Sequence, residues 1–273
     1  MSKNANQYEY QWAPETYDQH ETQTDDVEFI CGLLDDLRRR TGLDRPLKVL
    51  EACCGTGRIL IPLAQAGHEA VGIEQSRGML ERAWQKLTAL PAEVRERTTL
   101  IQADMTTDPW PTDFDAVVMA GNCFYELAAE DEQEGFIASA ASALRPGGHL
   151  LVDNDHMEGP LPKNWTRPGM GKTRFGGKLA DGSIVEYWTE NLDCDAPNRI
   201  WRARRTVRII RPDGKREEHA LFQQKHPVSF AEVEGWLARH GFAIAATFGD
   251  HRGSPYRPEA PRAIFWAGKG DGE

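Results

Sequence analysis

The chain has 273 residues, a length that suits one large α/β domain or a core domain with an insertion. Its formal net charge of −10 argues against broad nucleic-acid affinity, which requires clustered lysine and arginine. The sequence shows no charged-apolar-small signal at its N-terminus and no long apolar run, so we expect no export and no membrane span. Its five cysteines lack the two-pair spacing of a metal site, so we predict no metal and a reduced, cytoplasmic protein.

Apolar periodicity predicts alternating helices and strands from residue 15 to residue 153. Residues 15–40 keep the helical period, and Thr41-Gly42 ends that helix. Patterns of buried strands follow at 47–52, 69–74, 98–102, 114–120 and 149–153. Helical patterns separate them at 59–66, 76–90 and 130–144, and a turn at 145–148 precedes the fifth strand. This alternation predicts a doubly wound parallel sheet, whose ligands lie at the carboxyl ends of the strands. Those ends carry Glu51, Glu74, Asp104, the turn at 120–122 and Asp153.

A glycine turn joins the first strand to the next helix. Its sequence is Glu51-Ala-Cys-Cys-Gly-Thr-Gly57. Glycines here would let a ligand lie on the backbone and at the N-terminus of the helix. The turn by itself leaves open an ordinary strand–turn–helix unit without a ligand.

Beyond residue 153 the composition and the apolar periodicity of the sequence change. Residues 159–172 are rich in glycine and proline, and three runs of period two follow at 184–190, 199–210 and 218–224. Asp-Gly pairs at 181–182 and 213–214 are hairpin signals, so we predict a small inserted antiparallel sheet. Ser229 to His240 forms a helix with a capping box. Segments 242–249 and 263–267 would close the main sheet as an antiparallel pair.

Five blocks carry a resemblance to a known family, and they are 51–57, Glu74, 102–105, 114–121 and 144–148. The five blocks follow one another in the order and spacing found in the class I S-adenosylmethionine (SAM)-dependent methyltransferases, which the chain resembles over roughly residues 45–155. The family's first glycine is Cys53 here. A dinucleotide oxidoreductase fits less well, because its third glycine would fall at Leu60 and the blocks around Asp104 and 144–148 would go unexplained.

The resemblance implies an α/β fold with a doubly wound, mostly parallel seven-stranded sheet, an N-terminal helical cap and an antiparallel insertion after the fifth strand. We divide the chain into a cap (1–44), a SAM-binding core (45–158), an insertion that acts as a substrate lid (159–226) and a segment that completes the sheet (227–273).

The resemblance also implies roles for individual residues. Glu74 would accept both ribose hydroxyls, because one carboxylate can take two donors. Asp104 would accept from the adenine amino group, and Met105 would stack on the ring. Arg58 either pairs with the cofactor's carboxylate or is a surface helix residue. The remaining predicted cofactor contacts are Tyr17, Ala52, Cys53, Gly55, Gln75, Met79, Ala120 and Gly121.

A narrower resemblance concerns the acceptor. Tyr17-Asp18, 121–125, 153–156 and the inserted sheet are similar to small-molecule N-methyltransferases of the glycine/sarcosine, amino-sugar and lincosamide types. In those relatives the N-terminal segment and the inserted sheet cover the pocket, and an N-terminal aromatic residue touches the cofactor. The predicted catalytic residues are Tyr17, which could position an amine, and His156, which could take its proton. The predicted acceptor contacts are Tyr8, Asn122, Phe124, Tyr125, Asp155, Trp165 and Arg174.

Several functions remain open at this point. The leading hypothesis is transfer of methyl from SAM to a small-molecule amine, with S-adenosylhomocysteine as product. The alternatives are a small-molecule O-methyltransferase, a SAM-binding regulator without catalysis, and a nicotinamide enzyme. Residues 122–125 lack the Asn/Asp-Pro-Pro-Tyr pattern, which argues against polymer substrates. Aromatic residues near the N-terminus leave room for a homo-oligomer.

Overall fold

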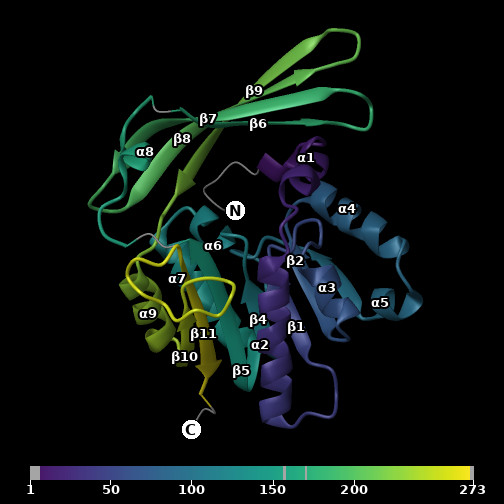
Figure 1. Cartoon of the computed structure of the whole chain (residues 1–273), viewed down its shortest axis with the longest axis vertical. Coiled ribbons are helices and arrows are strands. Elements are labelled where there is room, and N and C mark those ends of the chain that lie inside the picture. Colours follow the sequence, from purple (N-terminus) through teal and green to yellow (C-terminus); the bar gives the residue numbers. More distant parts are fainter. Residues whose placement is uncertain (1–6, 156–157, 170, 271–273) are drawn as a thin grey trace.

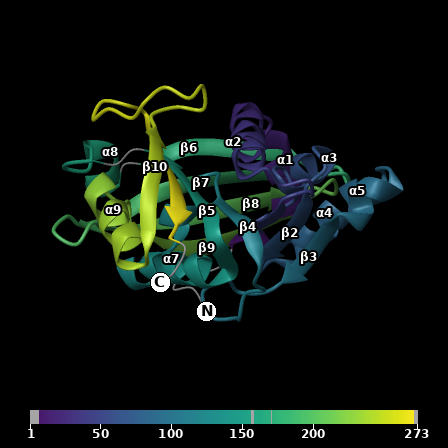
Figure 2. The same ribbon diagram turned by 90° about the horizontal axis from the view of Figure 1, so that it is seen from below.

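The core of the protein is a seven-stranded sheet with the strand order β10-β11-β5-β4-β1-β2-β3. The computed structural model describes residues 7–155, 158–169 and 171–270, with only the backbone of 171–175. The five parallel strands are β1 (Lys48–Ala52), β2 (Glu69–Glu74), β3 (Thr98–Gln102), β4 (Phe114–Met119) and β5 (Leu144–Asp155). The strands β10 (Phe242–Phe248) and β11 (Arg262–Lys269) close the sheet as an antiparallel pair. The predicted doubly wound sheet is therefore confirmed (Figure 2).

Both faces of this sheet are covered by helices. Helices α7 (Glu130–Ala143) and α9 (Phe230–Arg239) pack on one face, while α2 (Asp25–Thr41) and α3 (Leu60–Gln65) pack on the other. Successive strand residues serve opposite faces, so Val117 lies in the first apolar cluster and Val118 in the second. Burial on both sides explains why the central strands read as continuous apolar runs. Two further helices border the sheet, α4 (Arg77–Thr88) and α5 (Ala92–Glu96).

The helix predicted over 15–40 is two helices, α1 (Ala13–His20) and α2. The break falls in the polar run 19–24, which offers no apolar residue to pack. Three acidic residues then open α2, where they stabilise the positive end of a new helix dipole. In the described part of the chain, no helix combines the length and the apolar character that crossing a lipid bilayer requires.

The predicted turn at 145–148 belongs to β5. The strand accommodates the Pro-Gly-Gly sequence by an irregularity, because its register with β4 shifts between Phe114 and Ala116. A Cβ at Gly148 would lie 3.0 Å from the carbonyl oxygen of Arg145. Glycine is therefore required at this position, and the sequence signal was correct although the predicted element was not.

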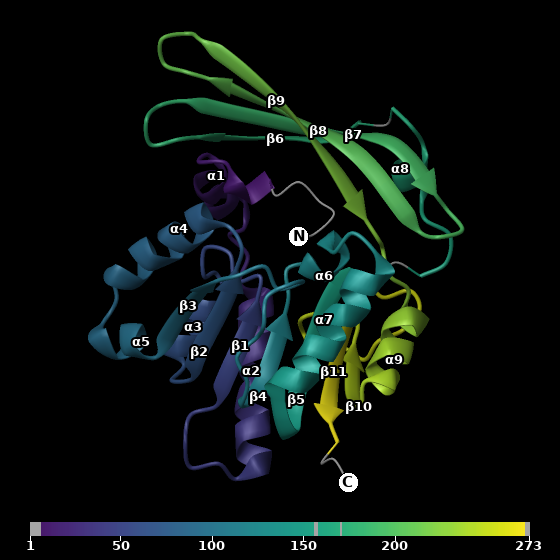
Figure 3. The same cartoon turned by 180° about the vertical axis from the view of Figure 1, so that it is seen from behind.

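The insertion is a separate four-stranded antiparallel sheet, which we call the lid sheet. Its strands are β6 (Gly171–Lys178), β7 (Ile184–Asp195), β8 (Ile200–Ile210) and β9 (Arg216–Lys225). The sequence predicted three of them and missed β6, whose glycines interrupt the alternation. The lid sheet lies across the carboxyl ends of the parallel strands, with α1 beneath it (Figures 1 and 3). Its inner face packs Val185 and Val207 against Trp12 and Ala13 of the N-terminal segment.

Candidate active site

The glycine turn after β1 has an unusual backbone. Cys53, Gly55 and Gly57 all have positive φ, at 60°, 56° and 79°. A Cβ at Gly57 would lie 3.0 Å from Ile61 Cδ1, so a larger residue would clash as well as strain the backbone. The turn thus curls tightly and presents its amides at the carboxyl edge of the sheet.

Glu74, at the tip of β2, fixes this turn in place. Its Oε2 accepts a hydrogen bond from the Gly55 N–H at 3.1 Å, and its Oε1 accepts one from the Ser76 N–H at 2.8 Å. Burial raises the pKa of this carboxyl, and the backbone donors partly oppose that effect. Met79, in the first turn of α4, packs its Cε 3.4 Å from the place a Gly55 Cβ would take. Glu74, Gly55 and Met79 are therefore brought together, as the resemblance implied.

A second predicted group follows β3. Asp104 Oδ1 accepts from the Thr106 N–H at 2.9 Å and from the Thr106 hydroxyl at 2.6 Å. Although desolvation acts in the opposite direction, these bonds keep the pKa of Asp104 below its usual value. Met105 Sδ lies 3.4 Å from Cys53 Sγ, so the end of β3 meets the glycine turn. Gln75 joins the same edge, because its carbonyl accepts from Gln102 Nε2 at 3.4 Å.

Arg58 is buried, so the surface-residue alternative is wrong. Only 14% of its side chain is exposed, and it holds Asp26 in a bidentate pair at 2.7 and 2.6 Å. Arg58 also bonds to the Tyr17 hydroxyl, and Gly121 is a close neighbour of its guanidinium. Burial raises the pKa of Tyr17 well above its usual value. Sequence reasoning missed Asp26, which only the packing of α2 brings to this place.

The N-terminal segment lies over the glycine turn and is tied to it by polar contacts. Asp18 Oδ1 accepts from the Thr56 hydroxyl at 2.7 Å and from Lys86 Nζ at 2.6 Å, while Oδ2 accepts from Arg82 Nε at 2.7 Å. The Ser76 hydroxyl donates to the carbonyl of Tyr8 at 2.5 Å. The rings of Tyr8 and Tyr17 meet edge to face at 6.2 Å.

The acceptor residues predicted after β4 take different places. Asn122 Oδ1 accepts from the Asp155 N–H at 2.7 Å and from Arg262 Nη2 at 3.0 Å, which ties the tips of β4, β5 and β11 together. Phe124 is fully buried against Phe136 and Trp236, so its side chain packs in the core and the predicted acceptor contact is wrong.

Tyr125 and Trp165 do meet, edge to face at 6.1 Å, beneath the lid sheet. Near them lie Glu126, Trp201 and Lys225, which sequence reasoning missed. Glu126 ends the short helix α6 (Cys123–Glu126). The sequence held only a weak indication of this group, namely Phe-Tyr-Glu at 124–126 and a lysine at the end of a predicted strand. His156 lies outside the described residues, and so does the side chain of Arg174.

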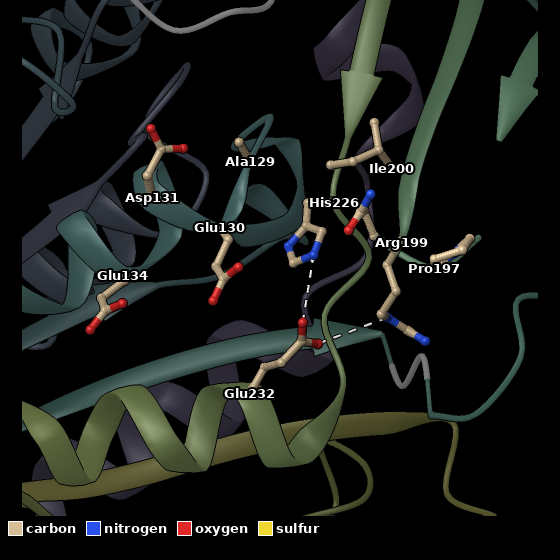
Figure 4. Close-up of a pocket in the computed structure, with 10 residues that line it drawn as sticks. Ala129, Glu130, Asp131, Glu134, Pro197, Arg199, Ile200, His226 and Glu232 are labelled. Atoms are coloured by element: carbon tan, nitrogen blue, oxygen red, sulfur yellow. Dashed lines mark ion pairs between the residues drawn. The ribbon is translucent and has the colours of Figure 1, made fainter. Parts of the chain in front are cut away.

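A cavity of about 510 Å³ lies at the joint between the lid sheet and the core (Figure 4). The starts of α7 and α9 and the turn between β7 and β8 surround it. Glu232 lies 3.6 Å from His226 and 3.8 Å from Arg199 within it, and burial lowers the pKa of His226. None of the predicted site residues lines this cavity.

The same Arg199 fastens both ends of the insertion. Its Nη1 donates to the carbonyl of Gly159 and its Nε to the carbonyl of Pro227, each at 2.7 Å. The chain therefore leaves the core and returns to it at neighbouring points.

Comparison with known proteins identifies the core. Residues 49–148 match a family model described as a methyltransferase domain. Residues 49–148 therefore form a SAM-dependent methyltransferase domain. The predicted family, fold and cofactor are thereby confirmed.

The methyltransferase domain has relatives among characterised proteins. Rat glycine N-methyltransferase is 31% identical over 159 residues, which are 55% of this chain and 53% of that protein. The chain thus spans about half the length of this curated relative.

Solved structures match the chain over nearly its whole length. The CcbJ methyltransferase of Streptomyces caelestis has a TM-score of 0.68 at 20% identity, over 96% of this chain and 98% of that one. The sugar N-methyltransferase KedS8 of Streptoalloteichus sp has a TM-score of 0.70 at 19% identity, over 93% and 91%. At this identity the two structures establish a shared fold, which includes the methyltransferase domain.

The residues of the methyltransferase domain fit SAM as cofactor. The backbone at Gly55 and Gly57 takes positive φ, which glycine adopts without strain, at the carboxyl end of β1 where a ligand of this fold lies. Glu51 Oε2 is buried and has no hydrogen-bond partner among the described residues. Burial raises the pKa of this carboxyl.

Proposed function

We propose that the protein transfers a methyl group from SAM to the nitrogen of a small-molecule amine of the natural-product or amino-acid type. The observation that carries the proposal is the joining of Glu74 to the positive-φ glycine turn, directly beneath the lid sheet and α1. The relatives and the structural neighbours favour nitrogen over oxygen as the atom that accepts the methyl group, since they include a glycine N-methyltransferase and a sugar N-methyltransferase.

In this proposal the chain's residues hold the cofactor at three places. Glu74 accepts from the ribose hydroxyls with the lone pairs that Gly55 and Ser76 leave open. Asp104 accepts from the adenine amino group, with Met105 against the ring. The backbone of Ala52 and Gly55 contacts the methionine part, and Arg58 pairs with its carboxylate from a position beside Asp26 and Tyr17.

The residues contribute chiefly alignment and exclusion of water. When bound, SAM would supply an electrophilic methyl group on a sulfonium. The lone pair of a neutral amine would form the new N–C bond in line as the C–S bond breaks and S-adenosylhomocysteine leaves as a neutral thioether. Holding two reactants in such a geometry lowers a barrier by about 7–11 kcal/mol. We infer that segments 1–44 and 159–226 act as cap and lid. Asp18 ties the cap to Thr56 of the glycine turn, and the Gln19 amide donates to the Lys178 carbonyl of the lid sheet at 2.8 Å.

The test is transfer of radiolabelled methyl from SAM to panels of amines and of phenols. The proposal predicts labelled N-methyl products from members of the amine panel. Turnover on phenols alone would overturn it in favour of an O-methyltransferase. Tight binding of SAM by the folded protein with no turnover on either panel would overturn it in favour of a regulatory SAM-binding protein.

A further inference from the structure

The ammonium of Lys225 lies inside a box of aromatic rings under the lid sheet. Only 11% of its side chain is exposed, and Nζ lies 4.8 Å from the ring centroid of Tyr125 and 5.8 Å from that of Trp201. Trp165 packs edge to face against both of these rings, 6.1 Å from Tyr125 and 5.0 Å from Trp201. Lysine is rarely buried to this degree without a partner.

The partner of Lys225 is the carboxylate of Glu126, and the two side chains form an ion pair. A carboxylate together with aromatic faces makes a receptor for alkylammonium ions, because ring faces carry negative charge density. Glu126 keeps 35% of its side chain exposed, so a second cation can approach it. Lys225 therefore shows that the box accepts an alkylammonium.

The box is assembled from both layers of the molecule. Tyr125 and Glu126 belong to α6, which follows the tip of β4, while Trp201 and Lys225 come from the lid strands β8 and β9. Figure 3 shows α6 beneath the end of β9. Trp201 and Lys225 are register partners, so a movement of the lid sheet away from the core would carry both away from Tyr125 and Glu126.

The box also adjoins the cofactor side. Cys123, which begins α6, is a free thiol beside the free thiol of Cys53 in the glycine turn, and this neighbour together with burial raises the pKa of Cys53. The Tyr8 hydroxyl is buried near Glu126, Cys123 and Tyr17, and this burial and these neighbours raise its pKa. Tyr8 therefore has both Glu126 and the predicted catalytic Tyr17 among its neighbours.

We propose that Glu126 and the rings of Tyr125, Trp165 and Trp201 bind the positively charged amino group of the acceptor, and that Lys225 occupies this site until the acceptor displaces it. This deepens the proposed function and rests on it. Alkylamines are protonated in neutral water, so the acceptor arrives as a cation, and it gives up one proton to water before its lone pair can accept the methyl group. Exchange of one ammonium for another leaves the net charge of the box unchanged and avoids a buried unpaired carboxylate.

The competing explanation is that the pair merely fastens the lid sheet to α6. The two explanations predict different effects on ligand binding when Lys225 and Glu126 are substituted separately. If the pair is only a fastening, Lys225→Met and Glu126→Gln break the same contact and change ligand binding in the same direction. If Lys225 is a placeholder, Lys225→Met removes the cation that competes for Glu126, whereas Glu126→Gln removes the charge that binds the ligand.

The experiment titrates the full chain with tetramethylammonium chloride and follows the broadening of its single proton resonance by NMR. This probe has no lone pair and cannot be methylated, so the test reads binding without turnover. Failure of methyl transfer to amines would therefore be distinguishable from failure of this inference. The neutral probe tert-butyl alcohol reports binding that needs no charge.

We expect Lys225→Met to tighten tetramethylammonium binding by about tenfold, a change of ~1.4 kcal/mol that lies within the range of desolvated cation–π contacts. Adding Glu126→Gln to that variant should abolish the gain, while binding of tert-butyl alcohol should change in neither. Arg204→Met is the matched control, because it breaks an exposed ion pair with Glu190 on the outer face of the lid sheet.

Unchanged or weaker binding in Lys225→Met would overturn the inference, as would an equal gain in Arg204→Met. A gain that survives Glu126→Gln would also overturn it. Lys225→Gln repeats the test with a polar replacement should the methionine variant not fold.

Discussion

The contact between Glu74 and the glycine turn leads to a quantitative prediction for Glu74→Gln. In the protein, one oxygen of this carboxylate accepts from Gly55 and the other from Ser76, and both remain able to accept from a ribose hydroxyl. An amide replaces one acceptor with a donor, which would then face an N–H group. Losing one hydrogen bond to a charged group costs about 1.5–3 kcal/mol, so the Kd for S-adenosylhomocysteine should rise about 10- to 150-fold.

Isothermal titration calorimetry with S-adenosylhomocysteine measures this Kd. Glu69→Gln is the matched control, because Glu69 begins the same strand with an exposed side chain. Burial raises the pKa of Glu74, so its ionised form is disfavoured in the fold, and removing that charge offsets part of the stability lost with the backbone hydrogen bond. If Glu74→Gln bound the ligand within twofold of the unaltered protein, the assignment of Glu74 to the ribose would be refuted.

Three further predictions concern the cap, the core and the pH dependence of stability. Asp18→Asn should loosen the cap, because it removes the charge that holds Lys86 and Arg82; faster proteolysis of the first 40 residues would show this, and an unchanged rate would contradict it. Phe124→Ala should lower the free energy of unfolding by about 3–5 kcal/mol in urea titrations, through the cavity it leaves; a loss near zero would restore Phe124 as an acceptor contact. For His251, burial lowers the pKa, but the bonds to Asp153 and Asp25 outweigh it and the pKa is raised. The protonated imidazole therefore stabilises the fold. Its contribution is complete below the pKa of the unfolded chain, about 6.5, and is lost as the pH rises through the higher pKa of the folded protein. The melting temperature should therefore exceed that of His251→Gln by more at pH 5.5 than at pH 8.5, and equal differences at the two values would contradict this.

Local features of the fold could be predicted because their causes are local. The buried run of β4 reads directly as a two-sided strand, with Val117 and Val118 serving opposite faces. The glycine turn and Glu74 were identified from a short pattern of small residues and one acid. The break between α1 and α2 was not, because helical periodicity on both sides of it hid a short polar gap.

Contacts between distant segments could not be predicted in this way. Asp26 and Arg58 are 32 residues apart, and Glu126 and Lys225 are 99 apart. Neither pair has a periodic signature, since each forms only when two layers have packed. Phe124 shows the converse error, because a residue beside a predicted site was assigned to it although its side chain turns into the core.

The position of Arg199 has a consequence for engineering and for evolutionary divergence. Because one guanidinium grips the chain where the insertion departs and where it returns, residues 159–226 form a cassette with two adjoining ends. A chimaera that exchanges this cassette between homologues needs only two short junctions, and the strand order of the seven-stranded sheet is unchanged. Under the proposed function, exchange of this cassette would change the acceptor preference and leave Glu74 and the glycine turn of the methyltransferase domain in place.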